Sequence, residues 1–94
     1  MVQTKTIEQD LKTAMKKRDS LRVSTLRMIL AALKNEQIAK KRLLSEAEEV
    51  QVLQKEVKKR QDSIEWYKRG NRQELAEKET KEAKIVKEYL PKAL

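Results

Sequence analysis

The sequence of 94 residues contains no cysteine, no histidine and no phenylalanine, and it has one glycine and one proline. Without cysteine there is no disulfide framework and no thiolate nucleophile. Without histidine, the side chain that most often serves as a general base near neutral pH is missing. The nitrogen and sulfur ligands that zinc prefers are missing as well. We therefore expect no catalytic residue, no metal site and no cofactor.

Carboxylates are the remaining candidates for chemistry, and three of them gather at Glu46, Glu48 and Glu49. Neighbouring carboxylates can transfer protons or hold a hard cation. These three also fall in the first turn of a predicted helix, where the helix dipole stabilises negative charge without any ligand. We favour this structural interpretation of the acidic cluster.

Long apolar segments are also missing. No run approaches the roughly 18 residues of a membrane-spanning helix, and the N-terminus has no apolar signal core. The sequence therefore predicts a soluble, cytoplasmic protein with no membrane partner.

What the chain does contain is typical of helices, since 40% of its residues are charged and 38% are apolar, with Lys, Glu, Ala and Leu abundant. The periodicity predicts an all-α fold, a four-helix, mostly antiparallel bundle. The first helix starts at a cap formed by Thr4 or Thr6, and buries a stripe of Ile7, Leu11 and Met15. The second helix, capped by Asp19 or Ser20, runs from about residue 21 to 41 and buries Leu26, Ile29, Leu30 and Leu33.

The longest predicted feature is a helical hairpin, with helices at about residues 46–69 and 72–89. Its first helix starts with Ser45 and Glu48, the Ser-x-x-Glu pattern of a capping box. An apolar seam follows, interrupted where Arg60 occupies a seam position; it consists of Val50, Leu53, Val57, Ile64 and Tyr67. A seam of this length also leaves a homodimer open.

The hairpin turn is predicted at Gly70, because glycine readily takes the left-handed conformation of a helix C-cap. Asn71, with Glu74 three residues later, then offers an N-cap for the last helix. That helix is predicted to stop at Pro91 and to bury Leu75, Ala83, Val86 and Leu90.

The net charge of +8 is unevenly distributed. Residues 1–45 carry 11 basic and 4 acidic groups, which gives +7, whereas residues 46–94 carry 12 and 11, which gives +1. Such a balance favours an anionic partner, such as RNA or an acidic protein surface. The alternative is that the charge serves only solubility.

The motif Lys-Lys-Arg occurs three times, at residues 16–18, 40–42 and 58–60. The first two fall at predicted helix ends, where basic residues offset the negative end of the helix dipole. The third lies in the middle of a helix and has no such explanation. Together with the hairpin turn it forms a candidate set for phosphate contacts: Lys55, Lys58, Lys59, Arg60, Lys68, Arg69 and Arg72.

Two qualifications apply to this set. Arg60 occupies a seam position, so it has the alternative of pairing with an acidic group inside the bundle. Aromatic residues that would stack on bases are few. Tyr67 and Tyr89 lie on apolar faces and are interpreted as core residues, whereas Trp66 lies beside the seam and either covers it or contacts a partner.

Motifs spread along nearly the whole chain form a recognisable set. Near the start they are residues 10–12 (DLK), 14–16 (AMK) and 22–35 (RVSTLRMILAALKN). In the middle they are residues 44–46 (LSE) and 55–64 (KEVKKRQDSI). Towards the end they are residues 70–72 (GNR), 75–79 (LAEKE) and 88–91 (EYLP). In order and spacing these motifs resemble the YqeY family.

The resemblance implies an association with tRNA. The YqeY family is similar to the C-terminal helical region of the B subunit of tRNA-dependent amidotransferases, which convert glutamate or aspartate mischarged on tRNA to the amide. That region contacts tRNA and carries no catalytic residue. Family members are often given a glutamine-dependent carbon–nitrogen ligase activity by inheritance from this similarity, but a chain without Cys or His supplies no such chemistry.

The resemblance also implies a domain organisation. Members normally continue past Tyr-Leu-Pro into a second small helical module. We therefore expect residues 1–94 to form a single helical domain like the N-terminal domain of the family, with the C-terminal module absent.

Two functions remain open from the sequence. In the first, the chain is a non-catalytic helical module that associates with tRNA, or with an amidotransferase-type protein, through its basic residues. In the second, it is a protein-interaction or structural domain whose basic surface only keeps it soluble. RNA binding that weakens with salt would favour the first. Salt-independent association with a protein at Trp66, Leu43 or Leu44 would favour the second.

Overall fold

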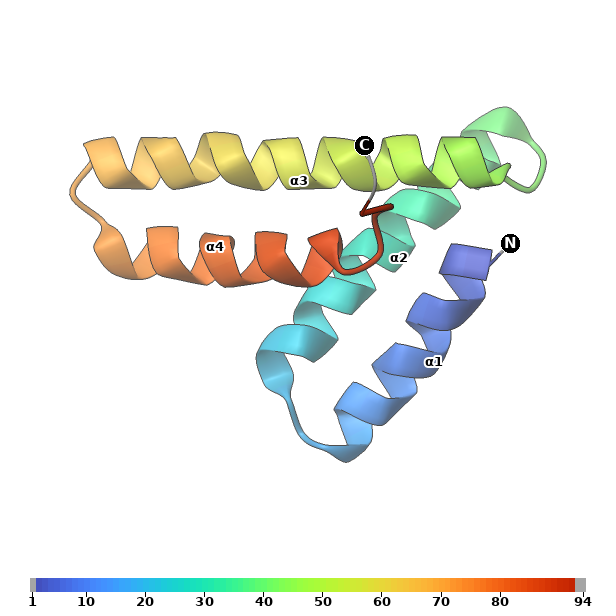
Figure 1. The fold of residues 1–94 in the computed structure, drawn as a ribbon, viewed down its shortest axis with the longest axis horizontal. Coiled ribbons are helices and arrows are strands. Elements are labelled where there is room, and N and C mark those ends of the chain that lie inside the picture. The colour runs from blue at the N-terminus through green and yellow to red at the C-terminus, as the bar shows by residue number, and fades with distance from the viewer. Residues whose placement is uncertain (1, 93–94) are drawn as a thin grey trace.

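A computed structural model describes residues 2–92, and within that range the chain forms four α-helices and no strand. The helices are α1 (Val2–Lys16), α2 (Ser20–Lys40), α3 (Glu46–Arg69) and α4 (Gln73–Lys87). α1 and α2 form one antiparallel hairpin, and α3 and α4 form a second one that crosses the first (Figure 1). The predicted all-α, mostly antiparallel four-helix bundle is confirmed, and so are the predicted bounds of α3.

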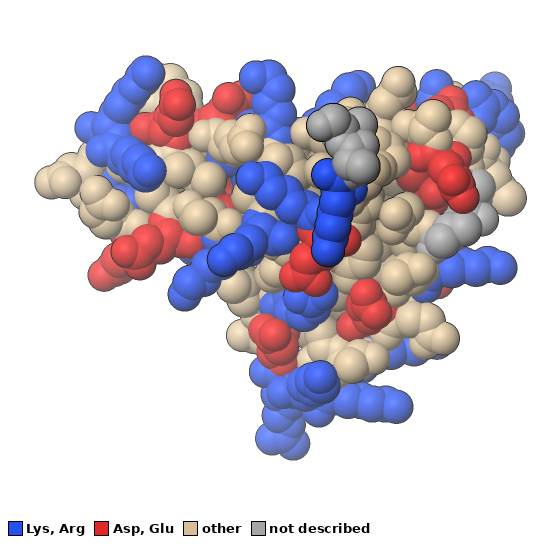
Figure 2. Space-filling view, in the orientation of Figure 1, with Lys and Arg blue, Asp and Glu red and all other residues tan. Residues whose placement is uncertain are grey.

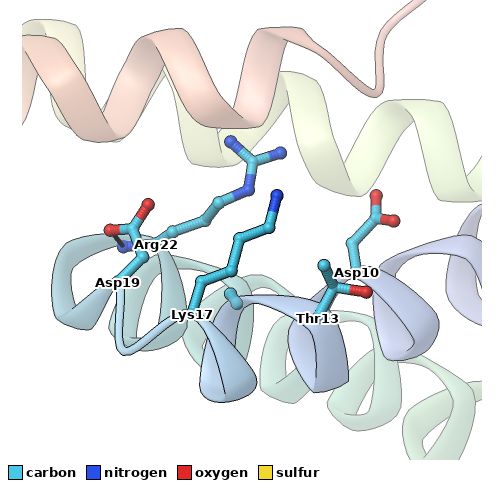
Figure 3. Close-up of a pocket in the computed structure, with 6 residues that line it drawn as sticks. Asp10, Thr13, Lys17, Asp19 and Arg22 are labelled. Carbon is cyan, nitrogen blue, oxygen red and sulfur yellow. Dashed lines mark hydrogen bonds between the residues drawn. The ribbon is translucent and has the colours of Figure 1, made fainter.

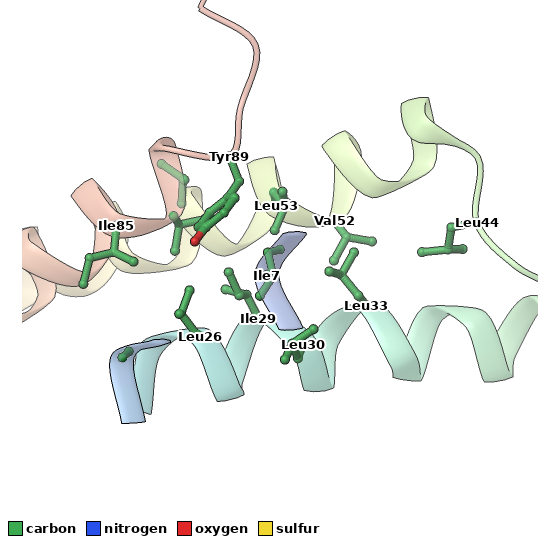
Figure 4. Packing of buried hydrophobic residues seen from close by; sticks show 13 residues of the cluster. Ile7, Leu26, Ile29, Leu30, Leu33, Leu44, Val52, Leu53, Ile85 and Tyr89 are labelled. Atoms are coloured by element: carbon green, nitrogen blue, oxygen red, sulfur yellow. The ribbon is translucent and has the colours of Figure 1, made fainter. Parts of the chain in front are cut away.

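The hydrophobic core lies where the two hairpins cross, and all four helices contribute to it (Figure 4). The core face predicted for the second helix is buried in full: Leu26, Ile29, Leu30 and Leu33. Burying an aliphatic side chain of this kind stabilises a fold by about 1.5–3 kcal/mol. The cluster also contains Ile7, Ala14, Leu44, Val52, Leu53, Val57, Ile85, Val86 and Tyr89.

Two residues predicted to be in the core are exposed instead. Met15 is 49% exposed and Leu75 is 37% exposed. Each lies near the tip of its hairpin, away from the crossing where other helices would cover it. Helical periodicity gives the side of the helix on which a residue lies, but not how far a neighbouring helix extends over that side.

The start of α1 also differs from the prediction. The helix begins at Val2, so Thr4 and Thr6 lie within it rather than before it. The Thr4 N–H and hydroxyl both donate to Glu49 Oε2, at 3.1 and 2.6 Å. Glu49 is completely buried. A carboxylate of α3 therefore accepts from a free N–H in the first turn of α1, as an N-cap side chain normally does.

The predicted caps of α2 and α3 are confirmed. Asp19 Oδ1 accepts the Arg22 N–H at 3.2 Å. Ser45 Oγ accepts the Glu48 N–H at 3.2 Å, and Glu48 Oε1 accepts the Ser45 N–H at 2.9 Å. Arg42 donates two further hydrogen bonds to this carboxylate, and they hold the pKa of Glu48 well below its usual range. Glu48 and Glu49 of the acidic cluster thus make structural contacts, whereas Glu46 is exposed.

The turn between α3 and α4 places its left-handed residue one position later than predicted. Gly70 has a φ of −82°, whereas Asn71 has a φ of 59°. Asparagine tolerates this region better than most residues, so the turn does not need glycine there. The N-cap of α4 is Arg72 rather than Asn71, and its side chain makes no capping hydrogen bond.

The end of α4 comes slightly before the predicted stop. The helix ends at Lys87, and residues 88–90 continue as tighter turns in which each N–H donates to the carbonyl three residues earlier. Pro91 follows and disfavours helical backbone in the residue before it. This short tail brings Glu88 and Tyr89 against the first hairpin.

Candidate nucleic-acid interface

Arg60, the only arginine of the third basic triplet, lies inside the α3–α4 hairpin with 4% of its side chain exposed. Its Nη1 donates to the main-chain oxygen and to Oε1 of Glu56, both at 3.1 Å. Its Nε lies 3.3 Å from Glu82 Oε1 on α4. The alternative that Arg60 pairs with an acidic group inside the bundle is confirmed, and the guanidinium does not face a ligand at the surface.

Three other members of the candidate set are exposed, but each faces a carboxylate of its own helix. Lys58 Nζ lies 3.8 Å from Asp62, and Arg69 Nη2 lies 3.8 Å from Glu65. Lys59 Nζ lies 3.4 Å from Glu56, which also holds Arg60. Exposed pairs of this kind add little stability. Their carboxylates do, however, reduce the attraction of these cations for a phosphate.

The last three members, Lys55, Lys68 and Arg72, are exposed and form no ion pair within residues 2–92. They are not close together. Lys68 and Arg72 lie at the hairpin tip, whereas Lys55 lies beside α2, about 20 Å away along the helix axis. The structure therefore does not bring the predicted set together as one site.

A larger group of unpaired cations lies on the first hairpin, and two of them, Lys16 and Arg18, belong to the triplet that the sequence analysis attributed to the helix dipole. We call it the α1–α2 basic face, and it consists of Lys5, Lys12, Lys16, Arg18, Arg27 and Lys34. All six are exposed, and none forms an ion pair with a carboxylate of the described chain. Figure 2 shows Lys and Arg side chains gathered at the corner formed by the α1–α2 turn. The sequence signal was the charge of +7 in residues 1–45.

The acidic residues of the first hairpin do not neutralise this face, because most of them are engaged elsewhere. Asp10 accepts a hydrogen bond from the Tyr89 hydroxyl at 2.5 Å, and Asp19 caps α2. Glu36 is half-buried in a hollow beside α3. Glu8, the remaining acidic residue of this hairpin, is exposed on α1 between Lys5 and Lys12, and it forms no ion pair with either in the described chain.

A hollow of about 440 Å³ lies within the α1–α2 basic face, where the end of α1 meets the start of α2. Its lining contains two guanidinium groups, two hydroxyls and no carboxylate: Met15, Arg18, Ser20, Val23, Ser24 and Arg27. Arginine and serine are common donors to phosphate oxygens. The hollow therefore offers the chemistry that an anion requires.

The opposite side of the α1–α2 turn has a different character (Figure 3). A second hollow, of about 390 Å³, is lined there by Asp10, Thr13, Ala14, Lys17, Asp19 and Arg22. Arg22 donates to both carboxylate oxygens of Glu88, at 2.7 and 3.1 Å. Together with the hydrogen bond from Tyr89 to Asp10, this pair attaches the end of α4 to the first hairpin. We interpret these polar contacts as a joint between the hairpins.

The pKa shifts at this joint follow from the same contacts. The hydrogen bond from Arg22 lowers the pKa of Glu88 and, in return, raises the pKa of Arg22. Burial raises the pKa of Tyr89, and its hydrogen bond to Asp10 raises it further. At neutral pH the joint therefore consists of an ion pair and a hydrogen bond donated by a neutral tyrosine.

Other kinds of site receive no support from the described residues. No three acidic side chains among them are placed to hold a metal ion. None of the four helices is long and apolar enough to cross a membrane.

Comparison with known proteins gives the family. The family model for YqeY-like proteins matches residues 4–94. The chain is 39% identical over 84 residues to altered inheritance of mitochondria protein 41 of Kluyveromyces lactis, which covers 88% of this chain and 45% of that protein. The counterpart in Lachancea thermotolerans is 39% identical over 85 residues, covering 89% of this chain and 46% of its own. The chain thus spans about half the length of these relatives.

A protein of Schizosaccharomyces pombe is 31% identical over 85 residues, which covers 90% of this chain and 69% of that protein. The predicted cytoplasmic location is contradicted by the first two relatives, because both are named as mitochondrial proteins. The predicted family, in contrast, is confirmed by a match that extends over nearly all of the sequence. The chain belongs to the YqeY-like family.

Proposed function

We propose that this domain is a non-catalytic module that binds a structured RNA, in the first place tRNA, through phosphates that contact the α1–α2 basic face. The observation that carries the proposal is that the six cations of this face are exposed and have no carboxylate partner in residues 2–92. Cations that are not compensated by their own neighbours bind phosphates and release counterions on binding.

The extent of the face favours a polyanion over a small anion. Lys5 and Lys16 are separated by about 16 Å along α1, and Arg27 and Lys34 by about 10 Å along α2. Arg18, which follows α1, and Arg27 of α2 line the same hollow, so phosphates of a folded nucleic acid can contact both helices there. The choice of tRNA rests on the resemblance of the YqeY family, to which the chain belongs, to the amidotransferase region described above. The same resemblance implies an amidotransferase-type protein as a second partner, in a complex of this domain with tRNA.

The test compares two charge-reversed variants in tRNA binding across a salt series from about 50 to 200 mM. The first variant, Arg27→Glu with Lys34→Glu, changes unpaired cations of the α1–α2 basic face. The control, Lys58→Glu with Arg69→Glu, changes cations that already face a carboxylate. Both variants change the net charge by the same amount. Arg60 is left unchanged because it is buried between Glu56 and Glu82.

We expect the first variant to bind tRNA at least about tenfold more weakly. Its affinity should also depend less on the salt concentration, by the amount that corresponds to about two lost phosphate contacts. The control should lose no more than about threefold, the effect of net charge alone. Equal losses in the two variants would show that only the net charge matters. No binding by the unchanged protein at the lowest salt would overturn the proposal.

A second function is favoured by two exposed apolar side chains at the end of α2 and in the turn that follows. Ile38 is 73% exposed and Leu43 is 69% exposed. Leu44, which was predicted to contact a partner, is buried instead. Apolar side chains exposed to this degree suit a protein interface. If they form one, Ile38→Ser with Leu43→Ser would abolish a salt-independent association, with an amidotransferase-type protein or between two copies, measured by sedimentation.

A further inference from the structure

Trp66, the only tryptophan of the chain, is 73% exposed on α3. It lies one turn before the end of the helix, in the part of the second hairpin that extends beyond the crossing (Figure 1). Of the two roles predicted for it, covering the apolar seam is wrong, because the ring faces solvent. Its neighbours one turn away on the helix are not apolar: Asp62, Ser63, Arg69 and Gly70.

An isolated aromatic ring in polar surroundings suits a nucleic-acid base better than a protein partner. Energetically important residues of protein interfaces lie in patches with packed neighbours that exclude water, and Trp66 has no apolar neighbour one turn away on α3. Stacking on a base needs only one free ring face, with cations within reach for the phosphates on either side.

The cations are present on the same side of α3. Lys55, Lys59 and Trp66 are spaced by four and seven residues, so they form one stripe along the helix. Lys59 precedes Trp66 by about 10 Å along the helix axis. Lys59 lies 3.4 Å from Glu56, so Lys55 is the cation of the stripe without an ion pair in the described chain. The acidic residues near Trp66 have basic partners outside the stripe, Asp62 with Lys58 and Glu65 with Arg69.

The stripe begins beside α2, the helix that carries Arg27 and Lys34 of the α1–α2 basic face. A hollow of about 270 Å³ between the two hairpins is lined by Lys55, Val52 and Glu56 of α3 and by Ala32, Asn35 and Glu36 of α2. Lys34, a member of the basic face, directly precedes Asn35. Because adjacent residues of a helix point to different sides, a nucleic-acid strand that follows both surfaces has to cross α2 before it continues along α3 towards Trp66.

We propose that Trp66 stacks on an unpaired base of the bound RNA. The domain then prefers an RNA in which a single-stranded segment adjoins a base-paired one. The paired part lies on the α1–α2 basic face, and the unpaired part follows the stripe of Lys55, Lys59 and Trp66. This inference rests on the proposed function and adds the class of RNA to it.

The experiment uses the single tryptophan as its own reporter. The protein is titrated with a blunt RNA hairpin, the same hairpin with a single-stranded tail, and a tailed hairpin whose tail lacks bases. Tryptophan emission is followed together with the fluorescence anisotropy of a label on the RNA. We expect all three RNAs to bind, and only the tail that carries bases to quench Trp66.

Trp66→Ala should lower the affinity for the tailed hairpin by about 5- to 100-fold and leave the affinity for the blunt hairpin unchanged. Trp66→Phe should restore part of the loss, because phenylalanine retains a stacking ring. Thermal unfolding of both variants serves as the folding control. The exposure of Trp66 predicts little change in stability.

The outcomes separate the two proposals. If blunt and tailed hairpins bind equally and Trp66→Ala changes neither, the stacking inference is overturned while the proposed function stands. If no RNA binds, the proposed function fails and the inference fails with it. If Trp66→Ala weakens self-association or a protein complex but not RNA binding, the ring belongs to a protein interface, and the inference is wrong.

Discussion

The two hairpins carry almost the same number of basic residues but differ in what surrounds them. Residues 1–45 contain 11 basic and 4 acidic groups, and residues 46–94 contain 12 and 11. In the second hairpin, Arg60 and several exposed cations face carboxylates of the same hairpin. In the first, the six cations of the basic face have no such partner in the described chain, although on the second hairpin Lys78, Lys81, Lys84 and Lys87 of α4 are also exposed without an ion pair there.

The same Lys-Lys-Arg motif has a different role in each hairpin. The triplet at residues 58–60 contributes to the interior of the second hairpin through Arg60. The triplet at residues 16–18 lies at the end of α1, exposed and unpaired. The position of the nearest carboxylate decides whether a cation stabilises the fold or is free to bind a ligand. Substitution of Arg60 should therefore lower the stability of the fold. Substitution of the cations of the basic face should lower the affinity for RNA and leave the stability nearly unchanged.

The largest expected effect is that of Arg60→Ala. It leaves Glu56 and Glu82 facing each other in a buried site without their cation, which should lower the free energy of unfolding by about 3–5 kcal/mol. Urea unfolding followed by circular dichroism measures this change. Lys58→Ala, which removes an exposed cation from the same triplet, should cost no more than about 0.5 kcal/mol. Equal effects of the two substitutions would remove the structural role assigned to Arg60.

Glu49→Ala should come next, because it removes the acceptor that joins α1 to α3. Thr4 then loses both of its hydrogen bonds to the buried carboxylate, at a cost of about 2 kcal/mol. Hydrogen exchange should show the loss in the first turn of α1 before it appears in α3 or α4. Glu46→Ala, an exposed residue of the same helical turn, is the matched control and should leave α1 protected.

The ion pair between the hairpins should give the stability a pH dependence on the acid side. Since Arg22 lowers the pKa of Glu88, the unfolded chain takes up this proton at a higher pH than the folded chain does. The contribution is therefore complete above the ordinary glutamate pKa and is lost as the pH falls through the lowered one. Arg22→Met should cost about 0.5–1 kcal/mol at pH 7 and weaken the acid dependence. An unchanged pH profile in this variant would contradict the assignment.

The smallest effect on stability is expected for Arg27→Ala with Lys34→Ala. Both side chains are exposed and unpaired, so the free energy of unfolding should change by no more than about 0.5 kcal/mol. Calorimetric melting checks this value. A loss above about 2 kcal/mol would show that these cations have a structural role, and the contrast between the hairpins would disappear.

Local signals in the sequence predicted the fold well. Ser45 and Glu48 placed the start of α3, and Asp19 placed the start of α2, because a capping side chain acts within a few residues of itself. Leu26, Ile29, Leu30 and Leu33 predicted the core face of α2 because helical periodicity determines a direction. The start of α1 was missed because its capping group, Glu49, is 45 residues away from Thr4 in the sequence.

The candidate site was predicted less well, although part of the signal was present. Glu56, Asp62 and Glu65 lie three or four residues from the cations that they face, so this neutralisation was readable from helical spacing. The charge count pointed to the first hairpin, whereas the triplet at residues 16–18, which lies there, was interpreted as offsetting the helix dipole. The partner of Arg60 on α4 and the exposure of Trp66 depend on how the helices pack, which spacing alone does not determine.

The two-hairpin arrangement also has a consequence for folding kinetics. Each hairpin closes through a short turn, so most of its contacts join residues that are near in sequence and can form early. The contacts that dock one hairpin on the other, Thr4 with Glu49 and Arg22 with Glu88, span 45 and 66 residues. We expect them to form after the transition state. Weakening them should therefore accelerate unfolding and leave the folding rate nearly unchanged.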